Sequence, residues 1–172
     1  MTRTALLIAA GTLVAMASPA LAAGPSDPQI AHIAYTAGVL DIAAAKQALR
    51  MSHNSAVRSF ASEMVRDHTA VNNKALALVK KLHVKPQANP TSEGLTKAAD
   101  GERAKLAKLK GAAFDREYVN NEVAYHKTVN GALQSTLIPS AHNGELKSLL
   151  ETGLKLFQEH QAHAEQVAAK LK

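Results

Sequence analysis

The sequence has no cysteine and no tryptophan, and aromatic residues make up only 3% of its 172 residues. Without cysteine, the chain can form neither disulfides nor thiolate metal sites, and it cannot carry the acylated cysteine of a lipoprotein anchor. The scarcity of aromatics leaves the scattered basic residues without stacking platforms, which disfavours nucleic-acid binding. The formal net charge of +6 predicts instead a solvated basic surface that is drawn weakly to anionic components of the cell envelope.

The longest apolar run stands at the N-terminus, where it follows a short basic start. Met1–Arg3 is basic, Ala5–Ala17 is apolar, and Ala20–Ala22 supplies small residues of the kind found at cleavage sites. This layout predicts a secretory signal peptide over residues 1–22 and a periplasmic or secreted domain over residues 23–172. The apolar run is too short to remain as a transmembrane anchor, and no later stretch is long enough.

The rest of the chain shows helical spacing and no sustained period-two alternation, so we expect an all-α fold. Asp27 as N-cap and Pro28 at the first helical position begin a first helix that ends near Met51. The second expected helix follows the tight connection Ser52–Asn54 and ends near His83. The third runs from about Gly111 to Leu137, and the fourth runs from about Gly144 to the C-terminus.

The connections between these helices are short, long and short, in that order. The long one, residues 84–110, is polar, and Gly101 divides it into what we expect to be one or two short helical pieces. Short connections make neighbouring helices antiparallel. The pattern predicts a ferritin-like antiparallel four-helix bundle with a long crossover between the second and third helices.

Two of the expected helices carry an apolar seam with one histidine near its middle. Alternating steps of four and three predict that each seam is buried against neighbouring helices. Met64 and Phe157 should therefore be among the most buried side chains. The second-helix seam is Val57, Ala61, Met64, His68, Val71, Ala75, Leu78 and Leu82. The fourth-helix seam is Leu146, Leu150, Gly153, Phe157, His160, Ala164, Val167 and Leu171.

Four polar residues, one from each expected helix, interrupt the apolar faces near the helix midpoints: Asp41, His68, His126 and His160. Midpoints of similar-length helices share one layer of a bundle, so these side chains should meet in the interior. Three imidazoles and one carboxylate form a complete set of ligands for one divalent transition-metal ion.

A second interpretation of these residues needs no metal. A histidine in an apolar seam is often a neutral core residue, and its burial costs about 1–3 kcal/mol unless it finds a hydrogen-bond partner. The four residues would then form a structural hydrogen-bond cluster. Asp67 and Glu159 are the neighbouring acids that could orient the imidazoles in either case.

The remaining motifs give little support for catalysis. Two pairs at helical spacing, Glu122 with His126 and His160 with His163, could bind metal at the surface. No glutamate has a histidine three residues later, which disfavours a di-iron carboxylate site. The chain also has no glycine-rich phosphate loop and no nucleophile elbow.

Several segments resemble the bacterial family called domain of unknown function 4142. They are Gly38–Asp41, Phe60–His68, Phe114–Tyr118, His126 and Leu156–His160. The resemblance implies an exported, helical, ferritin-like protein without an established activity. It also implies that the family's recurring polar positions fall on Asp41 (usually Glu there), Asp67, His68, His126 and His160.

Two functions therefore remain open from the sequence. The first is an exported ferritin-like bundle that holds one transition-metal ion through Asp41, His68, His126 and His160. The alternative is a non-catalytic envelope stress or interaction protein in which the same four residues are purely structural.

Overall fold

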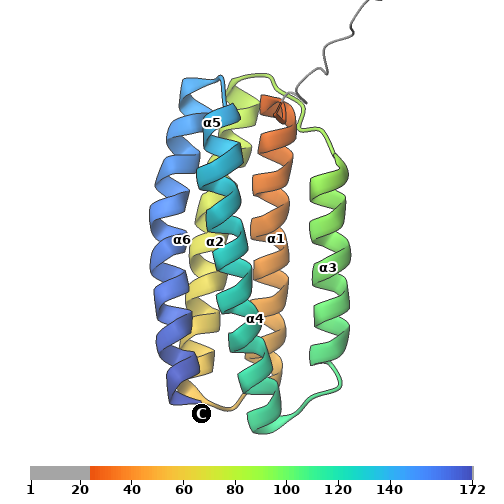
Figure 1. Ribbon diagram of the computed structural model, residues 1–172, viewed down its shortest axis with the longest axis vertical. Coiled ribbons are helices and arrows are strands. Elements are labelled where there is room, and N and C mark those ends of the chain that lie inside the picture. The colour runs from red at the N-terminus through yellow and green to blue at the C-terminus, as the bar shows by residue number, and fades with distance from the viewer. Residues whose placement is uncertain (1–23, 172) are drawn as a thin grey trace, which may run out of the picture.

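A computed structural model describes residues 24–171, and all the regular structure in that range is helical (Figure 1). The expected signal peptide, residues 1–22, lies outside the described residues. The five long helices are α1 (Asp27–Met51), α2 (Ser55–Lys81), α3 (Pro90–Leu106), α4 (Gly111–Ala132) and α6 (Gly144–Lys170). A π-helical turn, η1 (Leu133–Leu137), and the short α5 (Ile138–Ser140) join α4 to α6.

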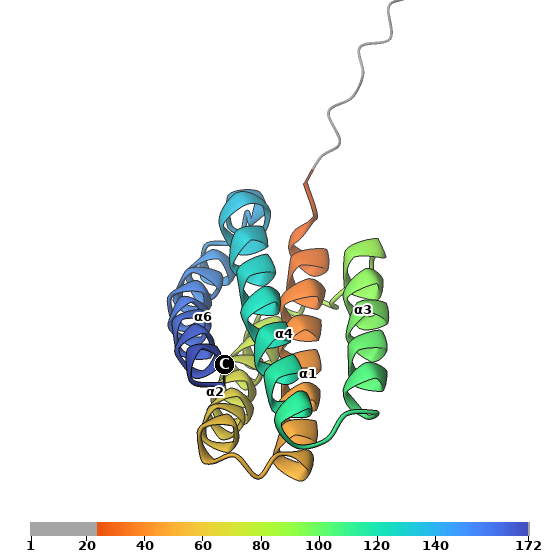
Figure 2. The same ribbon diagram turned by 60° about the horizontal axis from the view of Figure 1, so that its bottom comes forward.

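Four of the long helices enclose the interior and the fifth lies outside them. Helix α1 packs along α2, α4 packs along α6, and α2 also contacts α6 (Figure 2). Helix α3 packs on α1 and touches α4 (Figures 1 and 2). The all-α prediction is confirmed. The sequence predicted four long helices, whereas the described part of the chain has five. None of the helices described there combines the length and the apolar composition needed to cross a membrane.

The crossover between α2 and α4 forms one continuous helix rather than two short pieces. Gly101 lies inside α3 and does not divide it, because one glycine in a helix costs only about 1 kcal/mol relative to alanine. Only Ser92 and Leu106 are buried in this helix, in keeping with its polar sequence. Gly111 begins α4 at a φ of 54°, a left-handed conformation that favours glycine.

The N-terminus of α1 differs from the expected capping. Ser26, not Asp27, is the N-cap, and its backbone N–H donates to Gln29 Oε1 at 2.9 Å. The Asp27 carboxylate accepts instead from the backbone N–H groups of His142 at 2.9 Å and Asn143 at 2.8 Å. This acid therefore ties the start of α1 to the start of α6.

The end of α4 also differs from the expected regular helix to Leu137. From Leu133 the hydrogen bonds shift to π spacing, so that the N–H of Ile138 donates to the carbonyl of Leu133. Pro139, two residues beyond the expected end of the helix, lies inside the short α5. Leu133 and Leu137 remain buried through the π turn.

The apolar interior consists of two clusters at opposite ends of the helices. One surrounds Phe60, Met64 and Tyr118, all fully buried, and the other surrounds Ile30, Leu133 and Leu150. The prediction of a fully buried Met64 is confirmed. The same prediction for Phe157 is wrong, because this side chain is only partly buried.

Candidate metal centre

The four polar residues singled out by the sequence lie together between the two apolar clusters. Asp41 projects from α1, His68 from α2, His126 from α4 and His160 from α6. Their exposed fractions are only 1–3%. The three imidazole rings form a nearly equilateral triangle, with centroid separations of 5.7 Å for His68–His126, 5.3 Å for His68–His160 and 5.5 Å for His126–His160.

Helix α4 fixes the orientation and tautomer of His126. Its Nδ1 lies 3.0 Å from the carbonyl oxygen of Glu122, one turn earlier. A carbonyl can only accept, so Nδ1 carries the proton and Nε2 keeps a free lone pair. That Nε2 lies 3.5 Å from Asp41 Oδ2, so the free lone pair belongs to the nitrogen nearest Asp41.

A carboxylate outside the buried layer orients His160 in the same way. His160 Nε2 lies 3.1 Å from Asp67 Oδ2 across the α2–α6 interface. Arg66 holds this carboxylate through two hydrogen bonds of 2.6 and 2.9 Å, and these bonds lower the pKa of Asp67. The ionised Asp67 therefore accepts the Nε2 proton, and the lone pair of His160 is on Nδ1. Asp67 was one of the two acids expected to orient the imidazoles, whereas the other, Glu159, is exposed.

His68 completes the triangle and makes no hydrogen bond. Its Nε2 lies 3.3 Å from Asp41 Oδ2, but neither of its ring nitrogens nor either Asp41 oxygen has a hydrogen-bond partner. One face of the ring stacks on Phe157, with centroids 4.7 Å apart and an interplanar angle of 12°. The stacking fixes the plane of the ring while both nitrogens stay available.

Glu122 joins this group, although the sequence was read to place it at the surface with His126. Its exposed fraction is 1%, and its Oε2 lies 3.6 Å from His126 Nδ1 without a hydrogen-bond partner. The spacing of Glu122 from Tyr118 and His126, both on the buried face of α4, was the signal that could have identified it. His163 is not part of the group, because its Nδ1 pairs with Glu63 Oε2 at 2.7 Å on the partly exposed α2–α6 side.

About half of the buried side-chain polar atoms without hydrogen-bond partners in the described residues belong to this cluster. Such atoms are rare in folded proteins, because each costs about 1–3 kcal/mol. In the described part of the chain the cluster contributes seven of them: Asp41 Oδ1 and Oδ2, His68 Nδ1 and Nε2, Glu122 Oε2, His126 Nε2 and His160 Nδ1.

Burial controls the protonation of these groups. Desolvation raises the pKa of Asp41 from its ordinary 3.8 to about 8 and raises the pKa of Glu122 well above its usual range. The same cause lowers the pKa of His126 to about 4 and lowers those of His68 and His160. Without a cation, the buried acids therefore tend to hold protons and the imidazoles tend to be neutral.

The donor set fits a transition-metal ion in chemistry and nearly fits it in distance. The ligand atoms of His68, His126 and His160 all lie within 4.8 Å of one another, and so do those of Asp41, Glu122 and His126. Two ligand atoms of one tetrahedral zinc ion would lie about 3.3–3.4 Å apart at the usual bond lengths of 2.0–2.1 Å. Side chains separated by more than this would have to move closer together when the ion binds.

Together the fold and this cluster define a class, that of all-helical proteins with a buried layer of histidines and carboxylates. The chain belongs to the family described as Domain of unknown function (DUF4142), which it matches over residues 11–167. The searches among curated proteins and among solved structures each found no match.

Proposed function

We propose that this protein binds one divalent transition-metal ion between α1, α2, α4 and α6. His68, His126, His160 and Asp41 would bind the ion, and Glu122 would be an additional carboxylate ligand. The observation that carries the proposal is the convergence of seven buried, unpartnered ligand atoms from four helices. A cation would bind one or more of these atoms from each of the five side chains, and the two carboxylates would balance its charge.

The surroundings of the cluster support metal binding. Ligating histidines usually donate their second N–H to a carboxylate or a carbonyl. His160 has such a contact with Asp67 and His126 has one with the carbonyl of Glu122. Both contacts leave the other ring nitrogen directed into the cluster as a ligand.

The alternative is a metal-free cluster in an envelope stress or interaction protein, and the raised pKa of Asp41 supports it. A protonated Asp41 could donate to His68 or His126, both within 3.5 Å of its Oδ2. That single proton would still leave several of the seven atoms without partners. The metal therefore accounts for more of the structure.

Elemental analysis of protein purified without an affinity tag tests the proposal. We expect close to one equivalent of a single transition metal, removable by a chelator and restored by adding that ion. The variant Glu122→Gln should bind the ion more weakly, whereas Glu117→Gln, on the same helix but outside the cluster, should not. Native protein without metal that also fails to take up any divalent ion would contradict the proposal.

We further infer that the domain is an exported, ferritin-like one. The connectivity of α1, α2, α4 and α6, with α3 as the long crossover, supports the ferritin-like assignment. Export rests on the three-part layout of residues 1–22. The intact mass of protein recovered from the periplasm should correspond to a chain that begins at about Ala23, and a mass that retains the leader would contradict cleavage.

A further inference from the structure

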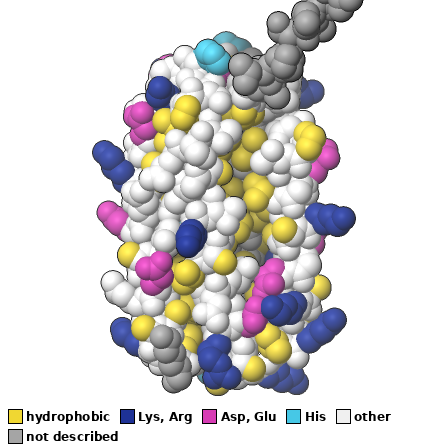
Figure 3. All heavy atoms as spheres, in the orientation of Figure 1, with side chains coloured by type: hydrophobic (Ala, Val, Ile, Leu, Met, Phe, Trp, Pro, Cys, Tyr) yellow, Lys and Arg dark blue, Asp and Glu magenta, His cyan; other side chains and the backbone are white. Residues whose placement is uncertain are grey.

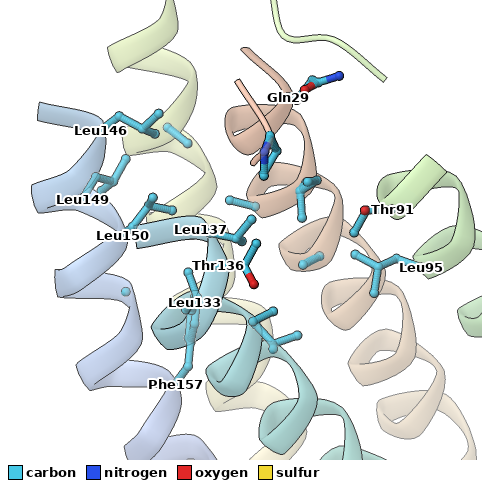
Figure 4. Close-up of a pocket in the computed structure, with 18 of the residues that line it drawn as sticks. Gln29, Thr91, Leu95, Leu133, Thr136, Leu137, Leu146, Leu149, Leu150 and Phe157 are labelled. Atoms are coloured by element: carbon cyan, nitrogen blue, oxygen red, sulfur yellow. The ribbon is translucent and has the colours of Figure 1, made fainter. Parts of the chain in front are cut away.

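An apolar cavity of about 530 Å³ lies beside the polar cluster, at the end of the molecule where α6 begins. The cavity is partly open to solvent, since Thr91, Thr128 and Thr136 in its lining are exposed. The close-up in Figure 4 shows Leu146, Leu150 and Phe157 of α6 facing Leu133 and Leu137 of η1 across it. In the space-filling view, hydrophobic side chains gather in a hollow between α3 and α4 (Figure 3).

Small side chains at positions that face the interior leave this space unfilled. Five of the lining residues are alanine or glycine: Ala34, Ala37, Ala75, Ala132 and Gly153. Val71 and Ala75 belong to the α2 seam, yet both stay only partly buried because they border the cavity.

The π turn contributes to the same wall. Leu133, Thr136 and Leu137 of η1 all line the cavity. A π turn in an α-helix is often found at functional sites. It is a second feature, independent of the volume, that departs from regular packing at this place.

The lining specifies the chemistry of a ligand. No aspartate, glutamate, lysine, arginine or histidine is among the lining residues of this cavity. The lining follows α6 from Leu146 to Phe157, about 16 Å at the helical rise per residue. This length and the volume of about 530 Å³ leave room for one extended hydrocarbon chain.

Two of the polar lining residues lie at the end farthest from Phe157. Gln29 and Thr91 stand at that end in Figure 4, near the first turns of α1 and α3, and Thr91 is exposed. A polar head group placed there could hydrogen-bond to an amide or a hydroxyl and still reach solvent. The apolar end of the chain would then point toward Phe157, which separates the cavity from His68.

From these features we propose that the cavity binds a single-chain amphiphile, such as a fatty acid, with its hydrocarbon chain inside and its head group at Gln29 and Thr91. The proposal does not depend on the metal. The ligand would occupy the side of Phe157 that faces away from the buried histidines.

Calorimetric titration of delipidated, chelator-treated protein with saturated fatty acids below their micelle concentrations tests this. We expect one saturable site, with affinity rising about fourfold for each added methylene until the cavity is filled. A monoacyl phospholipid of the same chain length should also bind if the chain is what is recognised, and its failure to bind would restrict the ligand to free fatty acids. Absence of saturable binding, or affinity that is independent of chain length, would overturn the proposal.

A matched pair of variants locates the site. Ala34→Phe fills the cavity and should weaken binding at least tenfold, whereas Ala162→Phe, on the exposed side of α6, should leave it unchanged. Equal binding by both variants would overturn the assignment. If Ala34→Phe does not fold, a photoreactive fatty acid on the wild-type protein decides: labelling of residues that line the cavity supports the site, and labelling only elsewhere contradicts it.

Discussion

Asp67 shows how a residue outside the buried layer can control the layer's chemistry. It binds the ring of His160 and is itself held by Arg66, whose side chain is 70% exposed. The result is a chain of contacts from the surface to the cluster. The position of the His160 lone pair therefore depends on an acid that need not touch the ion.

The first prediction follows from this contact. Asp67→Asn removes the charge that holds the Nε2 proton, so metal affinity should fall about 10- to 100-fold. Glu159→Gln is the matched control, because Glu159 is an exposed carboxylate next to His160 in sequence. Dissociation constants from competition with a coloured chelator measure both, and equal affinity for the two variants would refute this role of Asp67.

The sequence located some site residues better than others, for reasons that are specific to each. His68 and His160 stood out because each is the one imidazole in an otherwise apolar seam. Glu122 did not stand out because α4 has a less continuous apolar face, and a glutamate four residues from a histidine is common on exposed helix faces. Its surroundings include side chains of α1 and α3, which no local pattern contains.

At the scale of the helices, Gly38 sets how closely α1 approaches α2 near the cluster. A Cβ atom at this position would lie 2.4 Å from Asn72 Oδ1, closer than nonbonded atoms allow. Asn72 is buried one turn beyond His68 on α2. The absence of a side chain at Gly38 therefore leaves room for an amide beside the polar layer.

A pair of glycine substitutions tests this packing. Gly38→Ala should lower the free energy of unfolding by about 1–3 kcal/mol, since Asn72 must be displaced. Gly131→Ala, in α4 with no atom near the added Cβ, should raise it by about 0.5–1 kcal/mol through helix propensity. Urea melts give both values, and stabilisation by both substitutions would show that Asn72 yields without cost.

The helices themselves were predictable to within a few residues, apart from the crossover and the end of α4. Apolar spacing identified α1, α2, α4 and α6, because each buries one continuous face. The polar composition of α3 concealed a single helix, since that helix buries only Ser92 and Leu106. The sequence also did not predict the π turn or the cavity, because both depend on how the helices pack against one another. The positions of Val71 and Phe157 in their seams are the same whether the seam is closely packed or borders a cavity.

For the whole molecule, the buried cluster links stability to pH. In the unfolded chain the histidines titrate near pH 6.5 and the acids near pH 4. The folded pKa of His126 is about 4, so its contribution to stability is complete above pH 6.5 and is lost as the pH falls to about 4. His68 and His160 act in the same direction.

The buried acids act in the opposite direction. The folded pKa of Asp41 is about 8, so its contribution is complete below about pH 4 and is lost as the pH rises to about 8. Glu122 is shifted in the same direction. Between about pH 4 and 6.5, unfolding lets three histidines take up protons and two acids release them, so stability rises with pH. Above about pH 6.5 only the acids still differ in protonation, so stability falls. The metal-free protein should therefore be most stable near pH 6.5.

Denaturant melts of chelator-treated protein between pH 4 and 8.5 measure this profile. A bound metal ion replaces the acid protons, so it should remove the decline above pH 6.5 and steepen the loss of stability below it. A metal-free protein whose stability does not change between pH 4 and 8 would contradict the burial of these groups.

The most direct test of the metal centre compares the thermal unfolding of wild type, His68→Leu and His53→Leu, each with chelator and with zinc, copper or manganese. At 100 times the dissociation constant, the right ion should stabilise wild type by about 2.7 kcal/mol, or about 5–10 °C in Tm. His53 is exposed, so His53→Leu should respond like wild type. His68→Leu should lose the response while its metal-free form is at least as stable as wild type, because the apolar seam of α2 becomes continuous. An identical response of wild type and His68→Leu to every ion, or a His68→Leu variant that is destabilised without metal, would contradict the metal centre.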